Sequence, residues 1–509
     1  MSQSLPSPPA RQGLAVLAAV CLAALMLPLS FSTGAMATPA IGRSLGGSAT
    51  MLTWITNAFM LSFGGLLMLA GAMSDQMGRK RMFLIGVGIF VGASLGLAIA
   101  PSLLFVDVLR AVQGVGAAAA LSGGSAALAQ EFDGQARTRA FSLLGTTFGV
   151  GLAFGPIVGG MIIELIGWRS IFLATSLIAT VAFILGSAWM RESRASSVSA
   201  LDWPGAMSFT ATLTLFTFAV IQAPASGWGS AVVILCLGAS LSALISFCWI
   251  ETRSAHPMLD LSLFRYPRFV GVQLLPIATC YGFVVLLVLL PFRFMGIEGR
   301  SETATGLLML AISGPMVVVP SIAATLTRWL SPGAISCFGL SVAAVGLLWL
   351  GQVPPGGDPV AALLLIGIGT GLPWGLMDGL SISVVPADRA GMAAGIFGTT
   401  RVAGEGLALA LVTAAMALLV SRELERDLPS TSSTALSGVA QRLAAGDLNQ
   451  AAAIVPGIDS TALVQIYADA FTTLTQGLAA VTLLSAALCF ALLRAPSRRP
   501  GAGEWAVQE

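Results

Sequence analysis

Fourteen long apolar segments divided by short polar breaks constrain this chain more than any other feature of its 509 residues. A helix needs about 20 apolar residues to cross a bilayer, so fourteen spans take up about 280–300 residues. The hydrophobic content of 56% agrees with this, and a charged fraction of only 9% is too small to cover soluble domains. The sequence therefore predicts an all-α polytopic membrane protein. We expect spans at 13–37, 50–73, 82–100, 103–129, 140–163, 170–190, 204–222, 229–250, 269–292, 303–327, 332–351, 360–384, 392–420 and 471–493.

Several other classes of protein are excluded. The apolar segments are continuous, unlike the alternating strands of membrane barrels, and a net charge of +2 gives nucleic acid no basic surface to bind. The six cysteines all lie inside apolar segments without ligand or paired spacing, so we expect neither disulfides nor a metal site. We expect no cofactor. The first segment faintly resembles a cleavable signal peptide, but the spans that follow favour an uncleaved helix.

The orientation is predicted from the lysines and arginines of the short loops, which collect on the cytoplasmic side. With a cytoplasmic N-terminus, sixteen of these residues lie in cytoplasmic loops and four in short external loops. We therefore expect both termini in the cytoplasm. The long segment 421–470 then lies outside; it contains two helix-like stretches and a Ser/Thr tract, and we expect an exposed loop.

The connection between the second and third spans combines an acid, three bases and two glycines. A purely topological role would require the bases but not the acid or the glycine spacing. The string closely resembles the G-x-x-x-D-x-x-G-R-K/R-R signature of the major facilitator superfamily. In that family it implies a cytoplasmic latch whose charge pairs break and reform as the two halves rock. The residues of this latch motif are Gly71, Asp75, Gly78, Arg79, Lys80 and Arg81.

The fourth span carries an arginine well inside the membrane. Arg110 lies about 12 Å deep at 1.5 Å per residue, where a charge is costly and indicates function. Arg110, Gln113 and Gly114 stand in a string that resembles the family motif R-x-x-Q-G-x-G-A. The resemblance implies proton transfer or substrate coordination by Arg110. The alternative is a structural ion pair with Asp107, which lies on the same helical face.

The fifth span contains glycines four residues apart around a proline. Such glycines allow two helices to pack very closely, and the proline bends the helix. Ordinary helix packing is one interpretation. The string also resembles the antiporter motif G-x-x-x-G-P-x-x-G-G, which implies an exporter rather than an importer. Its residues here are Gly151, Gly155, Pro156, Gly159 and Gly160.

Together with the span count, these motifs resemble the drug:proton antiporter-2 family over residues 13–493. The resemblance implies a major facilitator fold with two six-helix bundles, 13–190 and 269–493, and two inserted helices at 204–250. The substrate site is then expected between the bundles near mid-membrane. One position departs from the family: Ser30 stands where members usually carry an acid in the first span. Coupling through the first span is therefore in doubt.

An acid appears instead in the thirteenth span. Glu405 follows Arg401 by four residues, so both side chains face the same side of a helix. Near the bilayer centre an unpaired carboxylate is expensive. We consider a static ion pair and a carboxyl that alternates between protonated and paired states. Asp378 in the twelfth span is a weaker candidate, because it can simply reach the cytoplasmic interface.

These features predict a proton-driven secondary transporter of the inner membrane that exports small amphiphilic molecules. Few acids lie within the spans, which argues against multivalent cations as cargo. A broad drug pump and a dedicated exporter of a siderophore or other metabolite remain alternatives, as does a downhill facilitator. A membrane enzyme would need a constellation of catalytic groups at one membrane face, which the sequence lacks. The partners expected are the cargo, protons and lipid, with room for a periplasmic adaptor.

Overall fold

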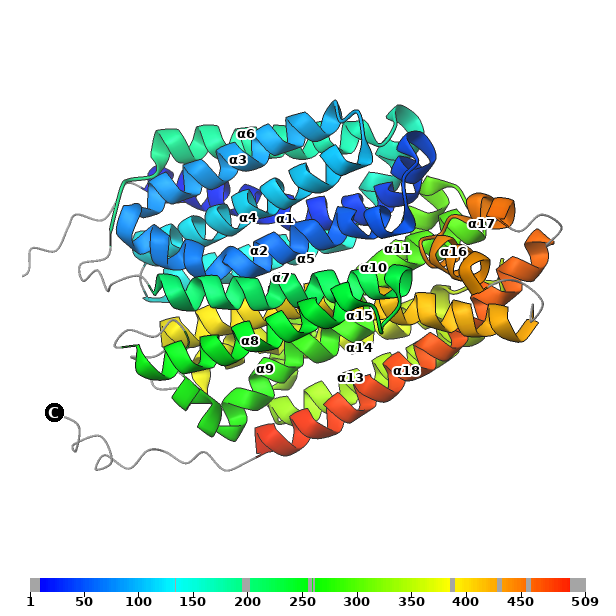
Figure 1. Cartoon of the computed structure of the whole chain (residues 1–509). Coiled ribbons are helices and arrows are strands. Elements are labelled where there is room, and N and C mark those ends of the chain that lie inside the picture. Colours follow the sequence, from blue (N-terminus) through cyan, green and yellow to red (C-terminus); the bar gives the residue numbers. More distant parts are fainter. Residues whose placement is uncertain are drawn as a thin grey trace, which may run out of the picture.

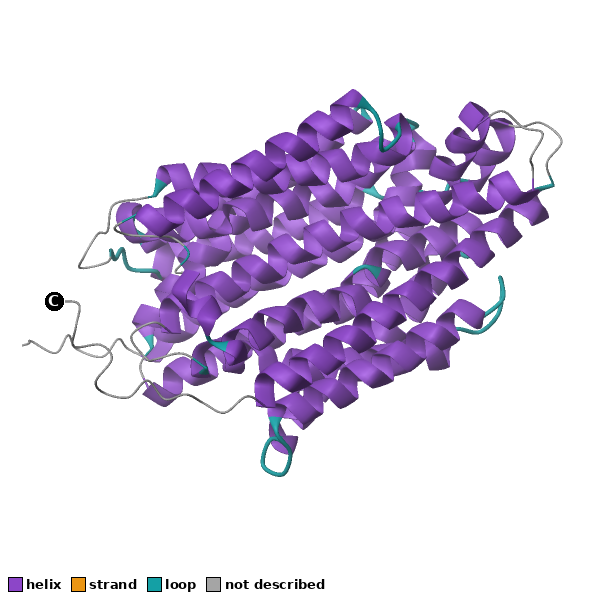
Figure 2. Ribbon diagram, turned by 60° about the horizontal axis from the view of Figure 1, so that its bottom comes forward, coloured by secondary structure: helices purple, strands orange, loops and turns teal. Residues whose placement is uncertain are grey.

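A computed structural model describes residues 10–132, 134–194, 202–254, 259, 261–384, 390–427, 433–454 and 459–494. All regular elements in these ranges are helices (Figure 2). Fourteen of the helical segments are long and apolar enough to cross a membrane, which confirms the predicted number of spans. Most predicted boundaries lie within a few residues of the observed ones.

Two six-helix bundles and an inserted pair make up the molecule (Figure 1). In the N bundle, α3 packs on α4 and α6, and α1 packs on α5 and α6. Its helices are α1 (Ala10–Leu45), α2 (Ala49–Met77), α3 (Arg79–Ala98), α4 (Leu103–Glu131), α5 (Gly134–Ile166) and α6 (Arg169–Trp189). The inserted helices α7 (Trp203–Ser226) and α8 (Ala231–Arg253) pack on each other, and α7 contacts both α2 and α15.

The C bundle holds six spans, of which the ninth and tenth are interrupted. The ninth comprises α9 (Pro267–Thr279), the π-helix η2 (Cys280–Val284), α10 (Leu286–Pro291) and the π-helix η3 (Phe292–Ile297). The tenth is divided into α11 (Glu302–Ser313) and α12 (Pro315–Leu326). The remaining spans are α13 (Pro332–Gln352), α14 (Val360–Ser383), α15 (Ala390–Asp427) and α18 (Ser460–Arg494), and a short 3-10 helix, η1 (Leu261–Arg265), precedes α9.

The two ends of the molecule are named here by the chain. The end at which α1 begins and α18 ends is the terminal end, and the opposite end is the far end (Figure 1). The latch motif lies at the terminal end, between α2 and α3. The ends of α1 and α5 and the beginning of α11 lie at the far end.

The long segment 421–470 is not the exposed loop that we expected. α15 continues to Asp427 and α18 begins at Ser460, and between them lie α16 (Ser433–Ala444) and α17 (Leu448–Ile454). α16 packs on α15 and also contacts α7, α18 and α2. Its apolar residues Leu436, Val439 and Leu443 are buried. The two helix-like stretches are present, but they fold back over the far end because α16 has an apolar face to cover.

Candidate functional site

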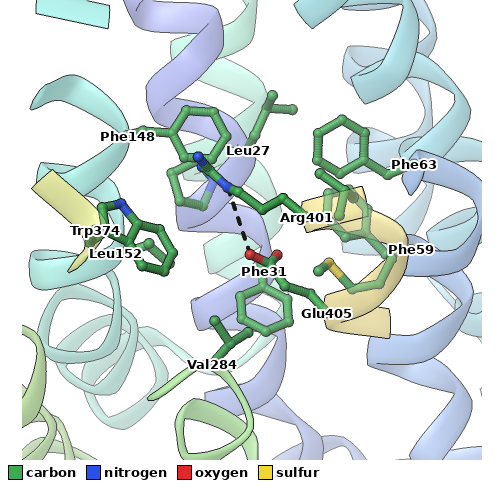
Figure 3. A pocket seen from close by; sticks show the side chains of 13 residues that line it. Leu27, Phe31, Phe59, Phe63, Phe148, Leu152, Val284, Trp374, Arg401 and Glu405 are labelled. Atoms are coloured by element: carbon green, nitrogen blue, oxygen red, sulfur yellow. Dashed lines mark ion pairs between the residues drawn. The ribbon is translucent and has the colours of Figure 1, made fainter. Parts of the chain in front are cut away.

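A cavity lies between the two bundles, as the resemblance implied (Figure 3). Its walls come from α1, α2 and α5 of the N bundle and from η2, α14 and α15 of the C bundle. The lining residues are Leu27, Pro28, Phe31, Phe59, Met60, Phe63, Phe148, Leu152, Val284, Trp374, Arg401, Val402 and Glu405. The cavity has a volume of about 30 Å³, room for water but far below the several hundred Å³ of a drug-sized site. A drug-sized ligand would therefore require the bundles to move apart.

Arg401 and Glu405 are the charged residues among those that line this cavity. One turn of α15 separates them, and Arg401 Nε lies 3.8 Å from Glu405 Oε1. The guanidinium also lies 5.4 Å from the ring centre of Phe148 and 5.0 Å from that of Trp374. Phe148 belongs to the N bundle and Trp374 to the C bundle, so aromatic rings from both bundles flank one cation.

Asp378 joins the same cluster. Its Oδ1 lies 3.5 Å from Arg401 Nη1, although Asp378 is on α14 and Arg401 on α15. The Asp378 side chain is 61% exposed and that of Glu405 only 12%. Arg401 therefore lies between the solvent-exposed carboxylate of Asp378 and the buried carboxyl group of Glu405. The sequence presented Asp378 as a separate, weaker candidate, and tertiary packing brings it beside the other two.

Arg110 lies elsewhere, fully buried inside the N bundle. Its Nη1 donates to Ser30 Oγ at 2.9 Å and to the Gln113 side chain, and its Nε donates to the carbonyl of Ile55 at 2.8 Å. Gln113 Nε2 in turn donates to Ser94 Oγ at 2.8 Å. The guanidinium also stacks 4.4 Å from the centre of the Phe59 ring.

The alternative of an ion pair between Arg110 and Asp107 is not observed. Within the described part of the chain, no carboxylate makes a salt bridge to Arg110, and Asp107 Oδ1 is buried without a hydrogen-bond partner. The residue that replaces the usual acid, Ser30, is instead a direct partner of Arg110. Sequence reasoning missed this contact because it joins residues eighty positions apart.

The latch motif is a helix junction rather than a loop. α2 extends to Met77, and Gly78 makes the turn with a φ of +114°, a conformation that favours glycine. Asp75 Oδ1 lies 3.4 Å from Arg79 Nη2, and Arg79 Nη1 donates to Gln130 of α4 at 2.8 Å. Each of these contacts lies within the N bundle.

Glu192, which the sequence did not single out, holds the start of α3. Its carboxylate accepts the backbone N–H groups of Lys80 and Arg81, each at 3.2 Å, and lies 3.6 Å from the Arg81 side chain. A carboxylate at a helix N-terminus satisfies otherwise unpaired N–H groups and the helix dipole. Glu192 lies only three residues beyond α6. The sequence feature that could have identified it is an acid shortly after a predicted span.

The antiporter motif packs α5 against two different helices. A Cβ on Gly155 would meet the side chain of Ser32, and one on Gly159 would come within 2.9 Å of the Thr33 side chain, both on α1. Gly151 is likewise covered by Pro28 of α1. A Cβ on Gly160 would instead meet the carbonyl oxygen of Glu302, on α11 of the C bundle. Three of the glycines therefore allow α5 to pack closely on α1 within the N bundle, and the fourth allows α5 to contact α11 of the C bundle.

The described residues contain no group of three or more His, Cys, Asp or Glu side chains that could hold a metal ion. The cavity is lined by one guanidinium and one carboxyl group beside aromatic and aliphatic walls, and Asp378, which is not a lining residue, pairs with the guanidinium. Such groups can bind and release a proton or pair with a charged ligand.

Comparisons with known proteins point to one family. The family model described as Major Facilitator Superfamily matches residues 20–409. Multidrug resistance protein Stp of Mycobacterium tuberculosis (strain CDC 1551 / Oshkosh) is 29% identical over 77% of this chain and 73% of its own length. Cephamycin export protein CmcT of Amycolatopsis lactamdurans is 31% identical over 77% of this chain and 82% of its own length. Puromycin resistance protein pur8 of Streptomyces alboniger is 31% identical over 80% and 82%.

Solved structures agree on the fold. A bacterial homolog of the human lysosomal transporter Spinster, in an inward-facing and unoccupied conformation, matches with a TM-score of 0.66 at 15% identity. The match covers 96% of this chain and 98% of that chain. At this identity the likeness concerns the fold alone.

Proposed function

This chain belongs to the major facilitator superfamily, and from that membership we propose that it exports small amphiphilic molecules across the cytoplasmic membrane in exchange for protons. Fourteen spans and relatives named for drug resistance or antibiotic export agree with the drug:proton antiporter-2 branch. The observation that carries the proposal is the buried carboxyl of Glu405 beside Arg401, in an apolar cavity between the bundles. Apolar and aromatic walls suit amphiphilic cargo, and the carboxyl suits a proton.

The cluster around Arg401 supports proton exchange at Glu405. The guanidinium of Arg401, 3.8 Å away, stabilises the ionised form of this buried carboxyl group. When Glu405 takes up a proton, Arg401 keeps a second partner in Asp378, so the guanidinium is never left unpaired. The proton and a cargo molecule that needs the ionised carboxylate then compete for one group. That competition is what an exchanger requires.

The chain is a multi-pass membrane protein, and we propose the inner membrane with the terminal end in the cytoplasm. The arginine and lysine distribution supports this orientation. The proposed activity is transport without a covalent reaction, and the superfamily's members are transporters. A periplasmic adaptor at the far end stays a prediction from the resemblance.

Two proposals describe the range of molecules that the protein exports. A multidrug pump is supported by the relative named for multidrug resistance, and a dedicated exporter by the relative named for cephamycin export. Both use the same cavity. A downhill facilitator is the remaining alternative, and it would move cargo equally well when the proton gradient is collapsed.

The test uses Glu405→Gln, which keeps the shape of the side chain and fixes the neutral state. We expect it to abolish uphill puromycin uptake into inverted vesicles and cargo-induced proton release from the detergent-solubilised protein, while Glu405→Asp keeps partial activity. The matched control is Glu423→Gln on the same helix, where the carboxylate pairs with the nearby Arg426. If Glu405→Gln exports and releases protons like the wild type, Glu405 is a static partner. The coupling group would then be sought at Asp107 or Asp378.

A further inference from the structure

The far-end half of α5 lies against α11 of the other bundle along several turns. Ser313 Oγ donates to the carbonyl of Ala153 at 2.7 Å, which is a hydrogen bond between bundles. Further toward the far end, a Cβ on Gly306 would come within 2.8 Å of Ile157 Cα, so the two backbones touch. By contrast, Gly145, in the terminal-end half of α5, has open space around it. The two bundles are therefore closed at the far end in this conformation.

Charged groups fasten the outer edge of this contact. Glu164, near the end of α5, accepts the backbone N–H of Thr303 with its Oε2 at 2.8 Å. Thr303 lies in the first turn of α11, whose N-cap Ser301 satisfies a different N–H, that of Ala304. Arg43, near the end of α1, makes an ion pair with Glu302 in the same turn. Two helices of the N bundle thus hold one helix N-terminus of the C bundle.

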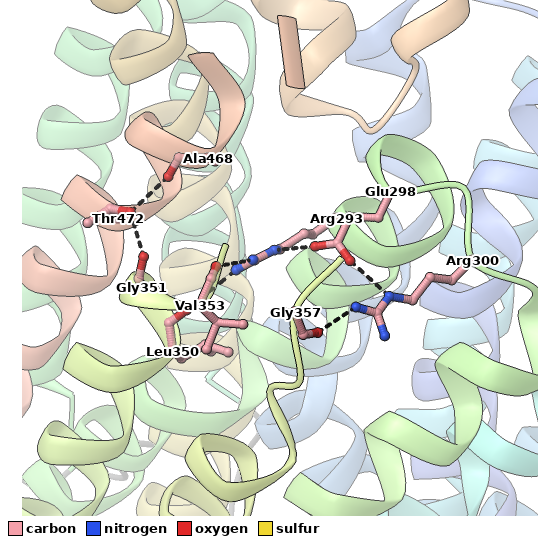
Figure 4. A network of polar contacts seen from close by, with 9 residues as sticks. All are labelled: Arg293, Glu298, Arg300, Leu350, Gly351, Val353, Gly357, Ala468 and Thr472. Carbon is pink, nitrogen blue, oxygen red and sulfur yellow. Dashed lines mark hydrogen bonds and ion pairs between the residues drawn. The ribbon is translucent and has the colours of Figure 1, made fainter. Parts of the chain in front are cut away.

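A second charged network at the far end lies within a single bundle and provides a comparison for Glu164 (Figure 4). Arg293 and Arg300 share Glu298, with distances of 2.8 Å to each of its oxygens. The side chains of Arg293 and Glu298 are each 3% exposed. The carbonyl partners are Leu350 in α13 and Val353 and Gly357 in the segment that follows α13. All members belong to the C bundle, so rocking of the bundles leaves the network intact. Glu164 differs because it is exposed and its contact joins two bodies that must separate.

We propose that Glu164 holds a gate at the far end closed. Its carboxylate closes the external mouth by capping α11 from the opposite bundle, and it must release Thr303 before cargo leaves. The inference rests on the proposed function for the direction of transport. A carboxylate at a helix N-terminus gains from the unpaired N–H groups and from the helix dipole. The bond is lost when the mouth opens, so it stabilises the closed state alone. Arg43 adds an ion pair to Glu302 across the same boundary between the bundles.

The experiment measures access to the cavity from outside. Leu152 lines the cavity on the terminal-end side of the Ala153–Ser313 bond, so Leu152→Cys reports opening of the far end. Intact cells are treated with a membrane-impermeant maleimide, and the chain without this substitution gives the background from its natural cysteines. We expect Glu164→Ala to raise the labelling rate of Leu152→Cys by about two- to fivefold. Glu164→Gln should have a smaller effect, because its amide oxygen still accepts the N–H bond.

The matched control is Glu423→Ala, which removes a far-end carboxylate whose pair with Arg426 stays within α15. It should leave the labelling rate unchanged. The gate is refuted if Glu164→Ala labels at the parent rate, or if Glu423→Ala raises the rate as much. The parent Leu152→Cys gives a second test. If it is labelled rapidly in intact cells and slowly in inverted vesicles, the cavity is already open to the outside, and this contradicts an external mouth held closed by Glu164.

Discussion

A single hydroxyl decides the environment of the most deeply buried charge in the N bundle. Ser30 Oγ accepts from Arg110 Nη1 at 2.9 Å and donates to Gln113 Oε1 at 3.1 Å. The guanidinium is therefore held by neutral groups, and a titrating partner is missing at the position where the family usually supplies an acid. This arrangement supports our proposal that the proton is carried by Glu405 in the other bundle.

We predict that Ser30→Ala destabilises the protein by about 1–3 kcal/mol, because it leaves buried polar groups of Arg110 and Gln113 without one partner. Thermal or denaturant unfolding of the purified protein in detergent measures this. The control is Ser246→Ala on α8, where an exposed hydroxyl donates to the carbonyl of Ser242 on the same helix. Its effect should stay within about 0.5 kcal/mol. Equal losses in the two variants would show that the Arg110 cluster does not depend on Ser30.

At the scale of elements, α5 belongs to the N bundle and also packs against α11 of the C bundle. Its glycines Gly151, Gly155 and Gly159 face α1, and Gly160 faces α11. The motif predicted from the sequence thus has two mechanical roles that the sequence did not separate. The α1 contacts hold one bundle together, whereas the α11 contact must break during transport.

We predict that Gly155→Leu abolishes export and lowers thermal stability in detergent, because the new side chain meets Ser32 in a contact built for bare backbone. The variant should still insert in the membrane, since the hydrophobicity of the span increases. Gly145→Leu is the control on the same helix, because a Cβ there meets nothing within 4 Å. Wild-type export by Gly155→Leu would refute the close α1–α5 contact.

The junction of α2 and α3 contains two acids in different settings, Asp75 and Glu192. Asp75 is 51% exposed and its pair with Arg79 buries little apolar surface, whereas Glu192 caps α3. We predict that Glu192→Ala lowers stability by about 0.5–2 kcal/mol, which unfolding in detergent measures.

We predict that Asp75→Asn abolishes export with near-normal membrane abundance. Transport assays, together with immunoblots of membranes, measure this. Loss of the Asp75→Asn protein from the membrane would contradict a role for the latch motif in transport.

At the scale of the whole molecule, the far-end helices α16 and α17 join elements that are distant in the sequence. Gln441 of α16 donates to the carbonyl of Pro224 on α7 at 3.0 Å, and Gly446 lies against the backbone of Phe292 in η3. α16 also contacts α15 and α18. α16 and α17 therefore connect the inserted pair to the C bundle, and we expect the inserted pair and the C bundle to move together.

We predict that Leu443→Ser in α16 destabilises the protein by about 2–5 kcal/mol, because it replaces a fully buried leucine by a small polar residue. Unfolding in detergent measures the loss. Ile454→Ser in α17 is the control, since Ile454 is 39% exposed and should tolerate the change. If both variants unfold like the wild type, α16 contributes nothing to the stability of the C bundle.

The sequence alone determined the class of protein, the number of spans and the contacts inside single helices. A long apolar segment specifies a membrane-spanning helix, because backbone N–H and C=O groups inside a bilayer must be hydrogen-bonded to one another, and only helices and closed barrels achieve this. The pairs Arg401–Glu405 and Asp75–Arg79 were predictable for a similar reason: residues four apart lie on one face of any helix.

Only the tertiary structure decided which helices supply the remaining partners. It placed Asp378 of α14 beside Arg401, Ser30 of α1 beside Arg110, and Glu164 of α5 on the first turn of α11. It also folded α16 back onto the spans, where the sequence suggested an exposed loop. These contacts depend on how helices pack and rotate against one another, and the helical period, which repeats within each span, carries no information about its neighbours.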